Sequence, residues 1–324
     1  MLRIGIPRGL LYYQYYPLWS TFFQEMGMEV VTSNPTSKAI MAAGSARMVA
    51  ETCLPVKVYC GHVIELVGKC DYLFIPAIRS IQKNVYNCSK FLGLPDLIKA
   101  VVPKCPPIID VDIDVSKGKV SLHPSSYEIG RWIKPRPKRE KEAAKLAWES
   151  HLAYIKAMES EMVSPLEYLS GQKPSLASQG NEHFTVALIG HPYNIYDEFI
   201  THRIIHRLNT LGARVVLPEM AGRDLLAAGV VKVVGRPYWT YEDEIVGAGG
   251  HYLDADVDGV VAIVSFGCGP DSTMIDVVQR YARRPGARPL LTLTIDEHTG
   301  EAGMVTRLEA FLDMVARKAR RRSA

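Results

Sequence analysis

The spacing of apolar and polar positions near the start of the chain predicts a strand, a helix and a second strand. Leu2–Ile6 is a short apolar run typical of a buried strand. Pro17–Met26 carries apolar residues at helical spacing, and Gly27 is placed to end that helix. Glu29–Thr32 predicts the next strand, so the chain opens with a βαβ unit.

The same layout recurs in the second half of the chain. Val186–Ile189 predicts a strand and Glu198–Leu211 a helix, which Gly212 is placed to end. Arg214–Leu217 predicts the strand that follows. The pattern therefore indicates a second βαβ unit.

A shift of 185 residues superimposes the two units. It aligns Pro7 with Pro192 and Gly27 with Gly212. It also aligns two strand valines in each half, namely Val30 and Val31 with Val215 and Val216. This internal repeat suggests two halves of like topology.

Three further apolar runs predict additional strands. Tyr72–Pro76 follows in the first half, and Gly259–Phe266 and Pro289–Ile295 follow in the second. Strands that alternate with helical stretches imply parallel sheets covered by helices. The predicted fold class is α/β, with two Rossmann-like domains connected by a helical segment.

The segment between the halves has a different composition. Glu140–Met162 reads as a long amphipathic helix, and Gln172–Glu182 is a polar stretch that suits a linker. We therefore predict an N-terminal α/β domain, a helical segment with linker, and a C-terminal α/β domain with a terminal helix. Their residue ranges are 1–125, 126–182 and 183–324.

Composition and charge limit the classes of function. Hydrophobic residues make up 48% and charged residues 22% of the 324 positions, as in folded globular proteins. The net charge of the chain is +4, and five basic residues near the C-terminus carry more than this excess: Arg317, Lys318, Arg320, Arg321 and Arg322. The body of the chain is thus near neutral, which argues against a nucleic-acid partner. No apolar run reaches the roughly 18 residues of a membrane span, so no membrane is expected.

The N-terminal residues favour a cytoplasmic setting. A strand-like Ile4–Pro7 follows Met1, Leu2 and Arg3, in place of the apolar core of a signal peptide. A reducing compartment argues against a disulfide framework. The cysteines are then either buried apolar residues or ligands.

Six cysteines are scattered along the chain without any CxxC pair: Cys53, Cys60, Cys70, Cys88, Cys105 and Cys268. Cys268 stands between two glycines just after an apolar run. Asp271 and Ser272 are placed to cap a helix that Met274 continues, with Cys268 in the turn at its N-terminus. The backbone N–H groups and the dipole there favour a thiolate. A buried cysteine in a tight turn is the alternative.

Two more cysteines stand in unusual surroundings. Pro55 suits the first turn of a helix, which places Cys53 near another helix N-terminus. Cys60 is two turns further, about 10 Å away by helix rise, too far to share one metal ion with Cys53, although the two could serve adjacent metals. Cys88 lies in the polar loop Asn84–Phe91, where a cysteine without a role is uncommon.

A structural role is favoured for Cys70 and Cys105. Structural zinc sites use paired ligands a few residues apart, a spacing absent here. A cysteine hydrolase would need a histidine held beside the nucleophile, for which His62, His191 and His298 are available. An iron–sulfur cluster held by cysteines from separate loops fits the scattered spacing better.

The strand ends offer further candidates. His298 lies in an acidic segment, Asp296–Glu301, that follows the Pro289–Ile295 strand. This segment either begins a last helix from about Ala302 to Lys318 or supports proton transfer. The tyrosines near the N-terminus (Tyr12, Tyr13, Tyr15 and Tyr16) are interpreted as surface and core aromatics. No GxxxxGK[ST] or GxGxxG phosphate loop is present.

Several long motifs together resemble one family. They are Glu51–Lys57 with Gly61 and His62, Phe91–Asp96, Gly190–Asp197, Ser265–Ser272 and Leu293–Gly303. On these motifs the chain resembles the acyl-CoA dehydratase activase-related family. That family is similar in turn to the β-subunit of 2-hydroxyacyl-CoA dehydratases and to the double-cubane cluster proteins. The resemblance is weakest between residues 113 and 182.

The resemblance implies a 4Fe–4S-type cluster held by Cys53, Cys88 and Cys268. A double-cubane cluster would draw on the other three cysteines as well. It also implies low-potential electrons from a separate ATP-dependent activase with an actin-like fold, and a possible homodimer. The expected function is reduction of an acyl-CoA or other small-molecule substrate at an open cluster iron, in an anaerobic setting. His191, His298 and Glu301 are the catalytic or proton-donor candidates.

Two alternatives remain open at the level of sequence. The chain is either a non-catalytic iron–sulfur carrier, acting in electron transfer or assembly, or a cluster-free binding protein whose cysteines pack in the core. The first alternative uses the same cysteines but needs no substrate pocket.

Overall fold

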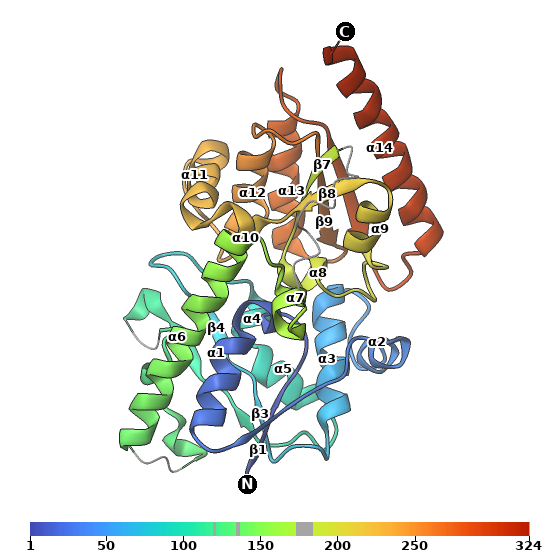
Figure 1. The fold of residues 1–324 in the computed structure, drawn as a ribbon. Helices are drawn as coiled ribbons and strands as arrows, with labels where there is room; N and C mark the ends of the chain where they lie inside the picture. Colours follow the sequence, from blue (N-terminus) through green and yellow to red (C-terminus); the bar gives the residue numbers. More distant parts are fainter. Residues whose placement is uncertain (119–120, 134–136, 173–183, 324) are drawn as a thin grey trace. The chain divides into compact units, whose positions relative to one another are not determined.

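The computed structural model describes the chain except for residues 119–120, 134–136, 173–183 and 324 (Figure 1). The chain divides into two compact units. One comprises Met1–Ile155 with Tyr238–Thr240, and the other Lys156–Pro237 with Tyr241–Ala324. The expected linker Gln172–Glu182 lies, apart from Gln172, outside the described residues. The three-part division of the chain stays a prediction.

A four-stranded parallel sheet forms the centre of the first unit, in the order β2-β1-β3-β5. Its strands are β1 (Arg3–Ile6), β2 (Glu29–Thr32), β3 (Tyr72–Phe74) and β5 (Ile108–Ile109). A separate parallel pair consists of β4 (Ala77–Ser80) and β6 (Asp112–Asp114). The central strand β1 is buried on both faces, since Ile4 and Ile6 are buried on one face and Gly5 between them is buried as well.

The helices of the first unit are α1 (Tyr12–Glu25), α2 (Lys38–Ser45), α3 (Leu54–Leu66), α4 (Ser89–Leu92), α5 (Leu94–Val101) and α6 (Pro137–Glu161), which passes into the second unit after Ile155. Short 3-10 turns are η1 (Val115–Lys117), η2 (Pro124–Ser126) and η3 (Ile129–Arg131).

The first helix begins at Tyr12, earlier than the apolar spacing predicted. Pro17 lies inside it and has no N–H to donate to the carbonyl of Tyr13. The buried hydroxyl of Tyr154, on α6, donates to that carbonyl over 2.6 Å. Tyr15 packs against Trp19, so the tyrosine-rich segment belongs largely to the aromatic core.

Two glycines set the close crossing of α2 and α3. A Cβ atom at Gly44 would lie 1.9 Å from the carbonyl oxygen of Lys57. A Cβ atom at Gly61 would lie 2.0 Å from the carbonyl oxygen of Ile40. Only glycine permits backbones to approach this closely, and the contact fixes α3, the helix that begins directly after Cys53.

The second unit repeats the topology of the first. Its parallel sheet has the order β8-β7-β9-β10. The strands are β7 (Phe184–Ile189), β8 (Ala213–Val216), β9 (Gly259–Ser265) and β10 (Leu290–Ile295). Gly27 and Gly212, aligned by the 185-residue shift, both follow a helix with left-handed φ values of 84° and 81°. The predicted α/β class with parallel sheets is confirmed.

Figure 1 shows α12 and α13 on one side of this sheet and α9 and α14 on the other. The helices are α7 (Pro165–Ser170), α8 (Pro192–Ile195), α9 (Ile204–Thr210), α10 (Pro218–Ala221), α11 (Arg223–Val234), α12 (Val246–Tyr252), α13 (Gly269–Ala282) and α14 (Glu301–Ser323), with η4 (Glu242–Glu244) before α12. Among the described residues, no helix is both long and apolar enough to cross a membrane.

The helix predicted over Glu198–Leu211 is shorter than expected. Asp197 accepts the backbone N–H groups of Phe199 and Ile200, which stabilises a turn there. His202 and Arg203 have positive φ values of 50° and 58°, outside the helical range. The regular helix α9 therefore begins only at Ile204.

Candidate functional site

The carboxyl ends of β7 and β9 bring two of the sequence motifs together. The chain leaves β7 for β8 on one side, while β9 pairs with β7 on the other. Ligands of open parallel sheets bind at such a switch point, beyond the strand ends. His191 lies in the loop after β7, and Cys268 lies in the loop after β9.

His191 is clamped between two carboxylates. Its Nδ1 hydrogen-bonds to Glu244, and its Nε2 lies 3.1 Å from Oδ1 of Asp271. Burial of the ring opposes the charged form, but Asp271 and Glu244 outweigh it and raise the pKa of His191 to about 10. At neutral pH the side chain is therefore an imidazolium, which can donate a proton but cannot act as a base.

Asp271 connects this imidazolium to the end of β9. It is fully buried, and its Oδ2 accepts the Ser265 N–H over 2.9 Å and the Asn194 side-chain amide over 3.4 Å. The hydroxyl of Ser265 donates to the side-chain oxygen Oδ1 of Asn194 over 2.6 Å. Burial opposes ionisation of Asp271, yet His191 and these donors lower its pKa.

The expected capping role of Asp271 and Ser272 is wrong. Helix α13 begins at Gly269, earlier than predicted, and Cys268 itself is the N-cap residue. Asp271 lies within the first turn, and its carboxylate faces the buried end of β9, while the Ser272 hydroxyl donates to the Cys268 carbonyl over 2.8 Å. The long-range partner His191 determines the direction of the Asp271 side chain.

Cys268 lies beside the same network. Its side chain is near enough to the Asp271 carboxylate to contribute to the lowered pKa of Asp271. Gly267 before it has a φ of 77°, and a Cβ atom at Gly269 after it would meet nothing within 4 Å. The preceding Phe266 is 63% exposed. A half-buried thiol thus lies beside a buried imidazolium–carboxylate pair, in a turn with free space on one side.

The other two predicted cysteines occupy corresponding positions in the first unit. Cys53 is the N-cap residue of α3 and Cys88 that of α4, both with extended backbone. All three predicted ligands therefore immediately precede a helix. At the longer helices α3 and α13, the N-terminal dipole favours the thiolate form.

Cys60, Cys70 and Cys105 have different surroundings. Burial raises the pKa of the Cys60 and Cys70 thiols to about 11, and it raises the pKa of Cys105 as well. The Cys70 thiol donates to the Leu66 carbonyl over 3.6 Å. Burial therefore favours the neutral thiol at these three positions.

A buried donor without a partner lies next to Cys88. The Asn87 side-chain oxygen accepts the Cys88 N–H over 3.1 Å, so the side-chain nitrogen Nδ2 of Asn87 takes no part in this bond. That nitrogen is buried and has no hydrogen-bond partner among the described residues. Buried donors are nearly always satisfied, so this one suits an acceptor bound beside Cys88.

His298 and Glu301 lie in a different turn. Asp296 accepts the backbone N–H of His298 and the hydroxyl of Thr299, which shapes the turn before α14. Both residues are exposed, and Glu301 pairs with Arg207. In the part of the chain that the structure describes, neither contacts His191, and their catalytic roles stay predictions.

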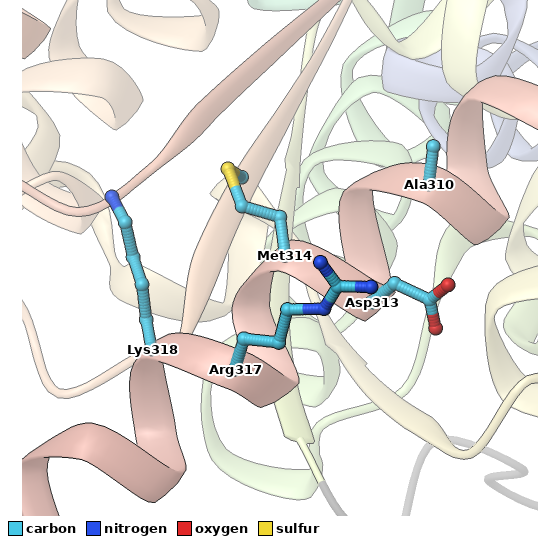
Figure 2. Close-up of a pocket in the computed structure, with 5 residues that line it drawn as sticks. All are labelled: Ala310, Asp313, Met314, Arg317 and Lys318. Atoms are coloured by element: carbon cyan, nitrogen blue, oxygen red, sulfur yellow. The ribbon is translucent and has the colours of Figure 1, made fainter.

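The described residues contain no group of three or more His, Cys, Asp or Glu side chains close enough to hold a metal ion. Cys53 and Cys88 belong to the first unit and Cys268 to the second. A pocket elsewhere is lined by residues of α14 alone: Ala310, Asp313, Met314, Arg317 and Lys318 (Figure 2). It contains none of the predicted site residues.

A family comparison identifies the chain. Residues 3–221, which are 219 of its 324 positions, match the family described as CoA enzyme activase uncharacterised domain (DUF2229). The chain belongs to this family. The result supports the resemblance to the acyl-CoA dehydratase activase-related family. Curated proteins give no match.

The matched region contains some of the candidate residues and not others. It includes Cys53, Cys88 and His191 but ends before Cys268 and Asp271. The CoA enzyme activase-related domain thus covers most of the first unit and the start of the second, through α10. The remaining strands β9 and β10 lie outside it.

Sequence reasoning missed three members of the network. Glu244 lies 53 residues from His191, in an acidic run that gave no signal of its own. Asn194 stands in the Gly190–Asp197 motif, which could have identified it. Asp271 was recognised only as a possible cap.

Proposed function

We propose that this chain is an iron–sulfur protein whose cluster is held by Cys53, Cys88 and Cys268. It would receive low-potential electrons from a separate ATP-dependent activase with an actin-like fold. It would pass them to an acyl-CoA or other small-molecule substrate, as a component related to 2-hydroxyacyl-CoA dehydratases. The proposal rests chiefly on one observation: each of the three cysteines is the N-cap residue of a helix.

The chemistry of these positions fits a cluster. Iron–sulfur clusters take thiolates, which the N-termini of α3 and α13 favour. Cys268 has room beside it because a Cβ atom at Gly269 would meet nothing. The unpartnered amide of Asn87 provides a hydrogen-bond donor suited to a sulfur atom next to Cys88. Membership of a CoA enzyme activase-related family supports the electron-transfer role.

A bound cluster would supply one-electron reduction, with an iron left open for substrate oxygen. Within the chain, His191 would act as a proton donor and position Cys268 through Asp271. His298 and Glu301 are further candidates for proton transfer. The proposed setting is cytoplasmic and anaerobic, and a homodimer is proposed as the assembly.

Iron and sulfide analysis after anaerobic purification, together with electron paramagnetic resonance, tests the ligand set. We expect the substitutions Cys53→Ser, Cys88→Ser and Cys268→Ser each to abolish or strongly reduce iron content. Cys60→Ser and Cys70→Ser are matched controls, because burial favours the neutral thiol at both positions. Iron-free protein after anaerobic reconstitution would contradict the proposal.

The control substitutions also distinguish cluster types. Loss of about half the iron in Cys60→Ser, Cys70→Ser or Cys105→Ser would indicate a double-cubane cluster. Mixing the loaded protein with an activase and ATP tests the function itself. ATP-dependent reduction supports the reductase, whereas a loaded cluster that no activase reduces would favour a carrier.

A further inference from the structure

The loop after β1 lies at the switch point of the first sheet. The chain leaves β1 for β2, while β3 pairs with β1 on the other side. This is the position that the His191 loop occupies in the second sheet. Here the loop carries Arg8, which the proposed function does not use.

The backbone of this loop is held rigidly. The Arg8 N–H donates to the Ser33 hydroxyl over 2.9 Å. Ser33 and Thr36 lie 2.9 Å from the two ring nitrogens of His62, which is fully buried. Leu10 has a φ of 48°, an uncommon conformation for a leucine. Such a strained, fixed loop at a sheet end is typical of a ligand-binding position.

The side chain of Arg8 is not matched to an acid. Its Nε is buried and has no hydrogen-bond partner, and Arg8 forms no ion pair among the described residues. The guanidinium carbon lies 5.6 Å from the centre of the Tyr12 ring. A cation over an aromatic face is held in place, but this contact leaves the buried Nε–H of Arg8 without an acceptor.

The groups around Arg8 are neutral. Burial lowers the pKa of His62 to about 4, so its ring is uncharged. Burial raises the pKa of Tyr12 to about 12 and also raises the pKa of Tyr16, while the charge of Arg8 lowers both by less. Both phenols therefore keep their protons. Glu65, the carboxylate that acts on His62, is bound by Lys69 and Asn34.

We propose that Arg8 binds an oxyanion, a carboxylate or phosphate group of a small-molecule ligand, at the carboxyl end of β1. The guanidinium would form charge-assisted hydrogen bonds to the oxyanion, and the nearby tyrosine hydroxyls are neutral potential donors. The site does not depend on the iron–sulfur proposal, because none of its residues is a proposed cluster ligand.

Thermal unfolding of the full chain in phosphate, acetate or chloride at equal ionic strength tests the site. We expect phosphate or acetate to raise the unfolding midpoint, and Arg8→Gln to weaken the apparent affinity about tenfold or more. A rise with phosphate alone assigns a phosphate group, and a rise with acetate alone assigns a carboxylate. Arg8→Lys keeps the charge without the planar fork and should retain only part of the effect.

Arg3→Gln is the matched control, since Arg3 lies at the start of β1, the strand that leads into the Arg8 loop, but pairs with Asp71. It should keep the full response to the anions. Modification of arginines by phenylglyoxal, mapped by mass spectrometry, gives a second measurement in which the effective anion should slow reaction at Arg8. The proposal is overturned if phosphate and acetate affect the unfolding midpoint and the phenylglyoxal reaction at Arg8 no more than chloride does. It is also overturned if Arg8→Gln responds to the anions like the wild type.

Discussion

The two units hold buried histidines beside the carboxyl ends of equivalent sheets, yet one ring is neutral and the other is positively charged. His62 lies between the hydroxyls of Ser33 and Thr36, and its pKa is lowered to about 4. His191 lies between the carboxylates of Glu244 and Asp271, and its pKa is raised to about 10.

The two histidines show separately how burial and how hydrogen-bond partners change the pKa of an imidazole. Burial by itself disfavours the imidazolium in both units. Two carboxylates reverse this effect at His191, whereas two hydroxyls cannot do so at His62. The same topology therefore holds a charged histidine between two carboxylates in the second unit. In the first unit it holds a neutral histidine between two hydroxyls, near Arg8.

The largest effect is expected from removing a carboxylate of the clamp. Asp271→Asn leaves the His191 imidazolium with one carboxylate in a buried site, and we expect a loss of about 3–5 kcal/mol in unfolding free energy. Urea denaturation measures it. Asp276→Asn is the control on the same helix. Asp276 is exposed, so losing its pair with Arg280 should change the unfolding free energy by no more than ~0.5 kcal/mol. Equal losses in both variants would rule out the clamp.

The pH dependence of stability should differ in sign between the two histidines. The folded pKa of His191 is raised from 6.5 to about 10, so its contribution is full below pH 6.5 and is lost as pH rises toward 10. The folded pKa of His62 is lowered from 6.5 to about 4, so its contribution is present above pH 6.5 and is lost as pH falls toward 4.

Chemical denaturation of His191→Gln and His62→Gln between pH 4 and 10 measures these contributions. We expect the destabilisation by His191→Gln to shrink at high pH and that by His62→Gln to shrink at low pH. Each change is on the order of 3 kcal/mol. Parallel curves for the two variants would show that the two rings do not differ in charge.

The glycines of the two strand-end loops should also differ. Gly190, before His191, has a φ of 153°, and a Cβ atom there would lie 2.6 Å from the Ile263 carbonyl oxygen. At Gly9 the nearest atom to an added Cβ is a Tyr59 ring carbon at 3.3 Å. We expect Gly190→Ala to cost about 2–3 kcal/mol and Gly9→Ala less than ~1 kcal/mol in thermal or urea unfolding. The reverse order would contradict these loop geometries.

The smallest expected effect isolates one carboxylate. Glu244→Gln keeps a hydrogen-bond partner for Nδ1 of His191 but removes a charge, so the pKa of His191 should fall by about 1–2 units. Nuclear magnetic resonance titration of the ring protons measures it. Glu198→Gln, which removes an exposed carboxylate paired with Arg203, should leave that pKa unchanged. An unshifted pKa in Glu244→Gln would assign the charge of His191 to Asp271 alone.

Local pattern predicted the elements because their causes are local. Apolar runs located β1, β2, β7, β8, β9 and β10 to within about two residues. Pro55 indicated the start of α3, and with it the N-cap position of Cys53. The helix starting at Ile204 was misjudged because positive φ values at His202 and Arg203 have no clear signal in the sequence.

The sequence by itself determined two similar α/β halves, the positions of Cys53 and Cys268 before helices and membership of the family. Only the tertiary structure decided which side chains meet: His191 with Glu244 and Asp271, and Arg8 with no acid in the part of the chain that the structure describes. These outcomes depend on residues 53 and 80 positions apart in the chain, brought together at a sheet end by strand order. Periodicity reports which face of an element is buried, whereas charge and pKa depend on the neighbours that folding supplies.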